Sequence, residues 1–110
     1  MKKIIISLLT VLSALFILTA CGNKKADYTE KAAESALNSG KNIEGKTVKF
    51  KVDQIDPNSS FGYNLQTGKH LNFVDSKNPN VKKGDTVTVK VKKVTSTLGS
   101  WIISYTDLKK

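Results

Sequence analysis

Side chains that commonly perform catalysis or bind metals are sparse in this chain. Its 110 residues include one cysteine, Cys21, and one histidine, His70, and all 18 basic residues are lysine. A multi-cysteine zinc site and an intramolecular disulfide are therefore excluded. The nine acidic residues are scattered singly, and the sequence contains no Gly-x-Ser-x-Gly elbow, evident Ser-His-Asp relay or phosphate-binding glycine loop. We expect a protein that is not an enzyme and that needs no metal and no cofactor.

Cys21 follows a segment with the order of an export signal. Two lysines precede an apolar run at residues 4–18, which at 15 residues is shorter than the roughly 20 needed to span a bilayer. Residues 1–20 are therefore predicted to be a cleaved signal peptide. The motif Leu18-Thr19-Ala20-Cys21 resembles the lipobox of bacterial lipoproteins. The resemblance implies transfer of diacylglycerol to the Cys21 sulfur and cleavage just before it; the alternative is that Cys21 merely ends an ordinary signal peptide.

The mature chain then starts at Cys21, and residues 21–28 are predicted to be the lipidated cysteine and a polar tether. Residues 29–42 are predicted to form a short helix and a connector. Asp27 and Glu30 have capping-box spacing, and Asn38-Ser39-Gly40 is a plausible stop. The face of this helix that packs on the domain is expected to consist of Ala32, Ala33, Ala36 and Leu37.

Residues 43–108 alternate between apolar and polar side chains, which predicts strands near residues 48–52, 61–65, 71–73, 87–91 and 101–105. Turns are expected at 56–60 and 67–69, and a crossover loop at 75–81. Five short strands in this order favour an all-β fold, a small five-stranded OB-like barrel that follows the helix. Alternation assigns six aromatic residues to its core: Phe50, Phe61, Tyr63, Phe73, Trp101 and Tyr105.

Two motifs carry a family resemblance. Gly45-Lys46-Thr47-Val48 and Lys83-Gly84-Asp85-Thr86-Val87-Thr88-Val89-Lys90 resemble the openings of strands in the bacterial OB-fold proteins grouped as tRNA-anticodon-binding-like. The resemblance covers about residues 30–108 and implies an OB-like domain of the kind found in exported proteins and lipoproteins. The family name is not evidence for tRNA binding.

OB barrels commonly bind ligands across their second and third strands, between the loops that join strands one to two and four to five. The ligand face predicted from this placement contains Ser59, Ser60, Asn64, Gln66, Lys69, His70, Asn72 and Thr97. His70 is expected to be an ordinary surface histidine, and Asp56, Asp75 and Asp85 to cap turns instead of binding calcium. Since aromatic side chains are assigned to the core and arginine is absent, binding of single-stranded nucleic acid is disfavoured.

These observations favour a non-catalytic, membrane-anchored lipoprotein on the extracytoplasmic face of the cell membrane. Its barrel would bind an envelope protein, a peptide or a glycan. Two alternatives remain open: a guard lipoprotein of the bacteriocin-immunity or phage-exclusion type, and a structural accessory of an envelope complex. The sequence leaves the identity of the partner and the oligomeric state open.

Overall fold

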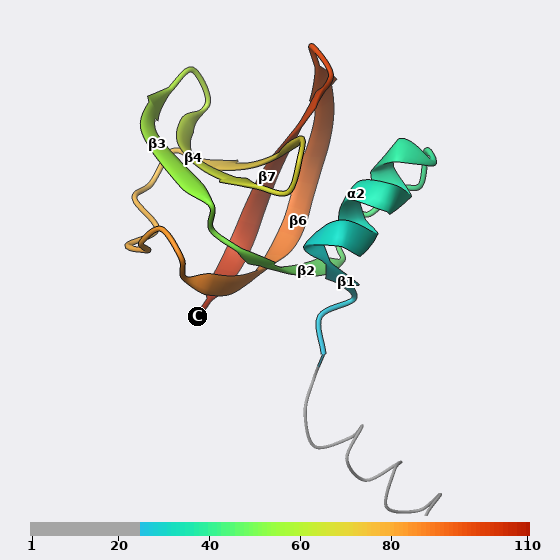
Figure 1. Cartoon of the computed structure of the whole chain (residues 1–110), viewed down its shortest axis with the longest axis horizontal. Helices are drawn as coiled ribbons and strands as arrows, with labels where there is room; N and C mark the ends of the chain where they lie inside the picture. Colours follow the sequence, from blue (N-terminus) through green and yellow to red (C-terminus); the bar gives the residue numbers. More distant parts are fainter. Residues whose placement is uncertain (1–24) are drawn as a thin grey trace, which may run out of the picture.

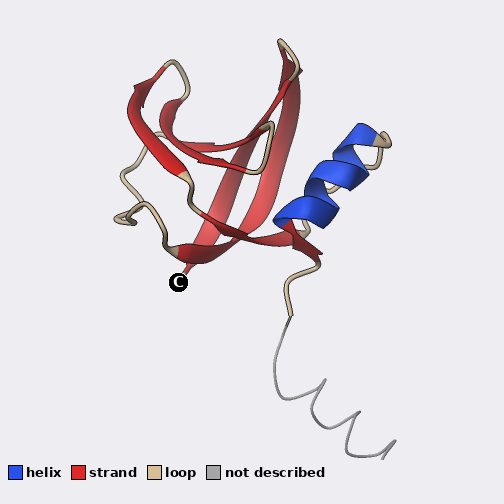
Figure 2. Ribbon diagram, in the orientation of Figure 1, coloured by secondary structure: helices blue, strands red, loops and turns tan. Residues whose placement is uncertain are grey.

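The computed structural model describes residues 25–110, so the predicted signal peptide and the lipobox with Cys21 lie outside the described residues. The described chain forms one helix and one seven-stranded mixed sheet of strand order β1-β2-β6-β7-β5-β4-β3 (Figures 1 and 2). The elements are β1 (Tyr28–Thr29), α2 (Glu30–Asn38), β2 (Thr47–Lys51), β3 (Gln54–Ser59), β4 (Gly62–Thr67), β5 (Leu71–Asp75), β6 (Thr86–Thr97) and β7 (Ser100–Lys109).

The expectation of a mostly β domain preceded by a short helix is confirmed, but the predicted five-stranded barrel is not, because seven strands form a sheet that does not close into a barrel. The first predicted strand is divided into β2 and β3, which lie near opposite ends of the strand order. The Val52 N–H donates to the Asp85 carbonyl at 2.8 Å, whereas the Asp53 N–H donates to the Gln66 carbonyl at 2.9 Å. Consecutive amides therefore bond to different parts of the sheet.

The strand β7 lies in the centre of the sheet, antiparallel to β6 and parallel to β5. Two parallel strands such as β5 and β7 must be connected by a long crossover. Residues 76–85 and β6 form this crossover, and it contains no helix, as predicted. The turn predicted at residues 56–60 is wrong, because Asp56 to Ser59 belong to β3. Pro57 is tolerated there because β3 is the last strand of the sheet and its outer side needs no ladder hydrogen bond.

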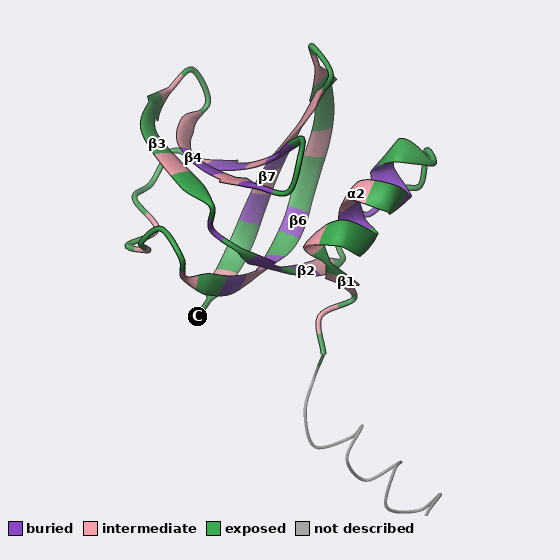
Figure 3. Ribbon diagram, viewed as in Figure 1, coloured by how far each residue is buried: buried purple, intermediate pink, exposed green. Residues whose placement is uncertain are grey.

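The core contains the apolar residues that alternate along β2, β5, β6 and β7 (Figure 3). Phe50 and Phe73 stack at its centre, with ring centroids 4.1 Å apart and ring planes 10° from parallel. Burial of Phe50, Phe73 and Tyr105 confirms three of the six aromatic core assignments. The other three need correction: Tyr63 and Trp101 are half-buried, and Phe61 is 50% exposed.

The N-cap of helix α2 is Thr29, two residues after the predicted cap Asp27. The Thr29 hydroxyl, and not Asp27, accepts the Ala32 N–H at 3.2 Å. The Asp27 carboxylate instead accepts the Thr47 N–H at 2.9 Å, which ties the chain before α2 to β2. The helix buries Ala33, Ala36 and Leu37 but leaves Ala32 exposed, and it ends as predicted, with Gly40 at a φ of 83°. Within residues 25–110 no helix is long and apolar enough to cross a membrane.

Candidate functional site

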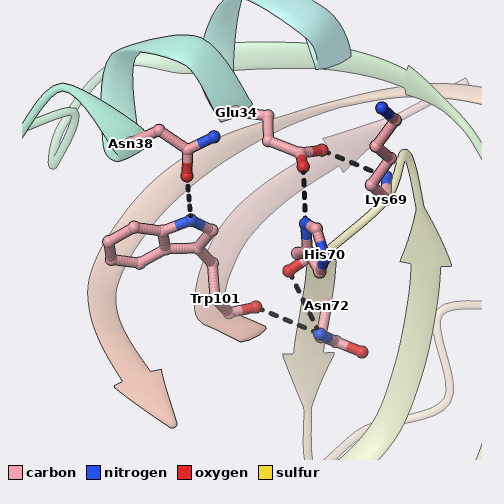
Figure 4. A network of polar contacts seen from close by, with 6 residues as sticks. All are labelled: Glu34, Asn38, Lys69, His70, Asn72 and Trp101. Carbon is pink, nitrogen blue, oxygen red and sulfur yellow. Dashed lines mark hydrogen bonds and ion pairs between the residues drawn. The ribbon is translucent and has the colours of Figure 1, made fainter. Parts of the chain in front are cut away.

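Two residues of the predicted ligand face, Lys69 and His70, bind the helix. The Glu34 carboxylate accepts the Lys69 N–H at 3.1 Å and the His70 Nδ1–H at 3.0 Å (Figure 4). His70 is 53% exposed, but Glu34 is only 13% exposed. His70 is therefore partly exposed, as expected of a surface histidine, and its ring also fixes α2 to the β4–β5 turn.

Burial of Glu34 by itself raises the pKa of its carboxyl group. The hydrogen bonds from the His70 ring and from the Lys69 and His70 backbone outweigh this effect, so the pKa lies below its ordinary value. Glu34 thus stays ionised at neutral pH and keeps accepting both donors. This charge-assisted contact is stronger than one between neutral groups.

Two further side chains of α2 bind the sheet. The Thr67 hydroxyl donates to Glu30 at 2.7 Å. The Trp101 indole N–H donates to Asn38 at 3.0 Å (Figure 4). Glu30, Glu34 and Asn38 are spaced by four residues and so lie on one face of the helix. The sequence predicts only packing for this helix. The four-residue spacing places the three polar side chains on one helix face, but it does not say which residues of the sheet they contact.

Asn64 and Asn72 form a polar network across β4 and β5. The Asn64 amide donates to Asn72 Oδ1 at 3.1 Å, and the Asn72 amide donates to the Trp101 carbonyl at 3.2 Å. Asn64 is 7% exposed, so its predicted outward position is wrong. Its Oδ1 is buried and has no hydrogen-bond partner among the described residues. Gln66, the neighbouring predicted ligand residue, is half-buried.

The predicted residue Ser59 stabilises the tip of the β3–β4 hairpin. Its hydroxyl donates to the Gly62 carbonyl and accepts the Phe61 N–H at 3.2 Å. Ser60 is exposed beside it, and Phe61 lies in the turn itself, because β4 starts only at Gly62. The glycine that follows Phe61 is the signal that it belongs to a turn and not to the core.

The β6–β7 hairpin ends in a second exposed apolar side chain. Thr97 is half-buried, and the next residue, Leu98, is fully exposed at a φ of 49°, a conformation that L side chains with bulk rarely adopt. Gly99 follows at a φ of 79°. The turn lies where the sequence predicts it, but the sequence predicts no role for Leu98.

The eight predicted site residues therefore belong to four places in the structure. These places are the β3–β4 tip (Ser59, Ser60), the β4–β5 strand pair (Asn64, Gln66, Asn72), the contact with α2 (Lys69, His70) and the β6–β7 tip (Thr97). A groove of about 920 Å³ along α2 includes Lys69 among its lining residues.

The two hairpin tips are poor in charge. No lysine occurs between residues 52 and 68, and no charged residue occurs between 94 and 106. Asp85 accepts the Lys82 N–H, as expected of a turn-capping aspartate. Asp56 accepts the Asn58 N–H, but it lies within β3 and not in a turn. In the described part of the chain no three side chains among His, Cys, Asp and Glu lie close enough to hold a metal ion together.

Comparisons of the chain with protein-family models, with curated proteins and with solved structures give no match. The functional argument therefore depends on the residues and their geometry alone.

Proposed function

We propose that the protein is a lipid-anchored, non-catalytic binding module on the extracytoplasmic face of the cell membrane. The observation that carries this proposal is the position of the chain's single cysteine. Cys21 ends the motif Leu18-Thr19-Ala20-Cys21 behind an apolar segment, and the first strand residue of the domain, Tyr28, follows seven residues later. A short polar segment between lipid and domain suits a protein held close to a membrane surface.

We also infer that the domain is of the OB type. Its support is the pairing of five strands: β2 with β6, β6 with β7, β7 with β5 and β5 with β4. A partly open, five-stranded Greek-key arrangement is the general form of that fold. The short β1 and the separate β3 extend the two ends of this arrangement.

The exposed apolar residues of the two hairpin tips, Phe61 and Leu98, are the proposed contacts with a partner protein. Both tips lie at the top of Figure 1, whereas the first described residues and the C-terminus lie at the bottom. The ten residues of β7 span roughly 30 Å at about 3.3 Å per residue, so the tip is far from the anchored end. An apolar partner surface fits these uncharged tips.

The exposed ring of Phe61 is also the feature that would suit base stacking. Phosphate contacts supply most of the affinity for single-stranded nucleic acid, however, and they come from lysine and arginine. The hairpin that carries Phe61, residues 54–67, contains no lysine and one acidic residue, Asp56. This charge distribution favours a protein partner over a nucleic acid.

The anchor is tested by replacing Cys21 with alanine and Lys24 with glutamine as a matched control. We expect the C21A chain to be lost from the membrane fraction and to lack the mass of two acyl chains, while K24Q retains both. Retention of C21A in the membrane would contradict the lipoprotein assignment.

The partner contact is tested by introducing a photo-crosslinking residue at the exposed position Ser60 in intact cells. We expect one discrete adduct that disappears when Leu98 is changed to aspartate and persists when the exposed Lys77 is changed to glutamate. An adduct of equal yield in both backgrounds would show that the tips are not the contact surface.

A further inference from the structure

A groove of about 370 Å³ lies at the end of the molecule where the described chain begins. Its lining comes from the residues before β1, from β2, from β6 and from the end of β7. We call it the lysine groove because four of its lining residues are lysines: Lys25, Lys90, Lys109 and Lys110.

The side chains that line the lysine groove carry a net positive charge. Asp107 is the one acidic residue in its lining, against the four lysines. Outside the lining, Asp85 lies 3.6 Å from the Lys110 ammonium group, and Asp27 is engaged by the Thr47 N–H and hydroxyl. Three carboxylates against four lysines still leave a surplus of one positive charge. The Thr47 N–H, as the largest effect, and the nearby Lys46 both lower the pKa of Asp27.

The lysine groove is held close to the proposed lipid anchor by the covalent chain. Lys25 follows Cys21 by four residues, and four extended residues reach at most roughly 14 Å. The surface potential of an anionic bilayer falls off over about one Debye length, near 8–10 Å at physiological salt. Full extension of the four residues would exceed this length, so docking through the groove requires them to be less than fully extended. Because the proposed anchor already holds the domain at the surface, docking has no further cost in translational entropy.

We propose that the lysine groove binds anionic phospholipid headgroups beside the anchor, and so sets the orientation of the domain on the membrane. This proposal depends on the lipid anchor proposed above and adds to it a second, electrostatic contact. Each lysine near an anionic leaflet contributes about 1 kcal/mol to the free energy of binding, which corresponds to roughly a fivefold change in the binding constant. Lysine suits this role because a diffuse headgroup charge requires no bidentate geometry.

Docking through the groove would direct the hairpin tips away from the bilayer. Lys109 and Ser100 lie at opposite ends of β7, and Ser100 pairs with Thr97 at the β6–β7 tip. Since the tips carry no lysine, they do not compete with the groove for headgroups.

The experiment uses the mature lipoprotein in vesicles of phosphatidylcholine, with or without phosphatidylglycerol. A membrane-impermeant amine reagent labels exposed lysines, and mass spectrometry gives the rate at each position. We expect phosphatidylglycerol to slow labelling of Lys25, Lys90 and Lys109 at least fivefold and to leave Lys69 and Lys77 unchanged. High salt should abolish the difference.

Variants test the charge dependence on the same vesicles. Lys90→Gln should reduce protection of Lys109 about fivefold, Lys77→Gln should not change it, and Asp107→Asn, which removes a negative charge, should increase it. Circular dichroism of each variant confirms that the fold is retained. Equal labelling rates on both vesicles, with the acyl mass present, would overturn the docking proposal and leave the anchor intact.

Two other outcomes would also contradict the docking proposal. A mature chain without acyl chains would overturn the anchor and, with it, the docking that depends on it. If a single-stranded oligonucleotide at the same phosphate concentration protected the three lysines as well as the vesicles do, the groove would be a general polyanion site and the proposal for lipid would fail.

Discussion

Asn64 and Asn72 show how an outward strand position can become part of the structure. Alternation assigns both side chains to the face opposite Leu65 and Phe73, where we expected them to meet a ligand. They bind each other and the Trp101 carbonyl instead, which connects β4, β5 and β7. Hydrogen bonds between buried groups are costly to remove because the remaining partner is left unpaired.

Replacement of Asn72 by alanine should therefore destabilise the domain by about 2–3 kcal/mol, because it removes donors to backbone carbonyls and the acceptor of the Asn64 amide. The half-buried neighbour Gln66, changed to alanine, should cost about 0.5 kcal/mol. Urea denaturation monitored by circular dichroism measures both. If the two midpoints coincided, Asn72 would be free for a ligand and not structural.

At the scale of elements, the contacts of α2 with the sheet depend on pH through Glu34. Because the pKa of this carboxyl is lower in the folded state than its reference value of 4.5, folding favours the ionised form. The stability that it contributes is therefore fully present above about pH 5, and it is lost as the pH falls through the folded-state pKa.

Glu34→Gln should lower the free energy of unfolding by about 1–2 kcal/mol at pH 7. The carboxylate accepts the Lys69 N–H and the His70 Nδ1–H on its two oxygens, whereas the neutral amide has only one acceptor oxygen. The difference from the unchanged protein should shrink as the pH falls below 4.5. The control is Glu44→Gln, whose carboxylate accepts a single, exposed N–H from Val94. A pH-independent difference would contradict the assigned role of the charge.

The β3–β4 hairpin depends on Gly62. A Cβ atom there would lie 2.5 Å from the Asp75 carbonyl oxygen, and the φ of 99° disfavours other residues. Gly84 has nearly the same φ, 94°, but open space around it. We expect Gly84→Ala to cost about 1–2 kcal/mol from backbone strain, and Gly62→Ala to cost about 2 kcal/mol more, because β4 and β5 must separate. Equal denaturation midpoints would contradict the close approach.

The sequence predicted α2, the crossover loop and most strand positions, because each has a local signal: helical spacing, proline with polar residues, or alternation. It did not predict that β2 and β3 separate, because that break depends on partners outside this segment: the Val52 N–H donates to the Asp85 carbonyl, and the Asp53 N–H donates to the Gln66 carbonyl. The polar contacts between α2 and the β4–β5 turn join residues 35 or more positions apart. No local pattern encodes such pairs.

At the scale of the whole molecule, the sheet requires its last strand. β7 separates β1, β2 and β6 from β5, β4 and β3, and it makes the longest set of pairings in the molecule, with β6. Removal of residues 100–110 should therefore leave a chain without cooperative unfolding, whereas removal of Lys109 and Lys110 alone should keep it. A sharp calorimetric transition in the longer deletion would show that half of the sheet folds by itself.

The central position of β7 also determines when the chain can fold. When a polypeptide emerges N-terminus first from a ribosome or a translocation channel, α2 and the first six strands emerge before β7, the strand that joins them. The hydrogen bond between Asn38 and Trp101 spans 63 residues and forms at the end of that process. The part of the sheet formed by β1, β2 and β6 and the part formed by β5, β4 and β3 therefore cannot be joined until β7 has emerged.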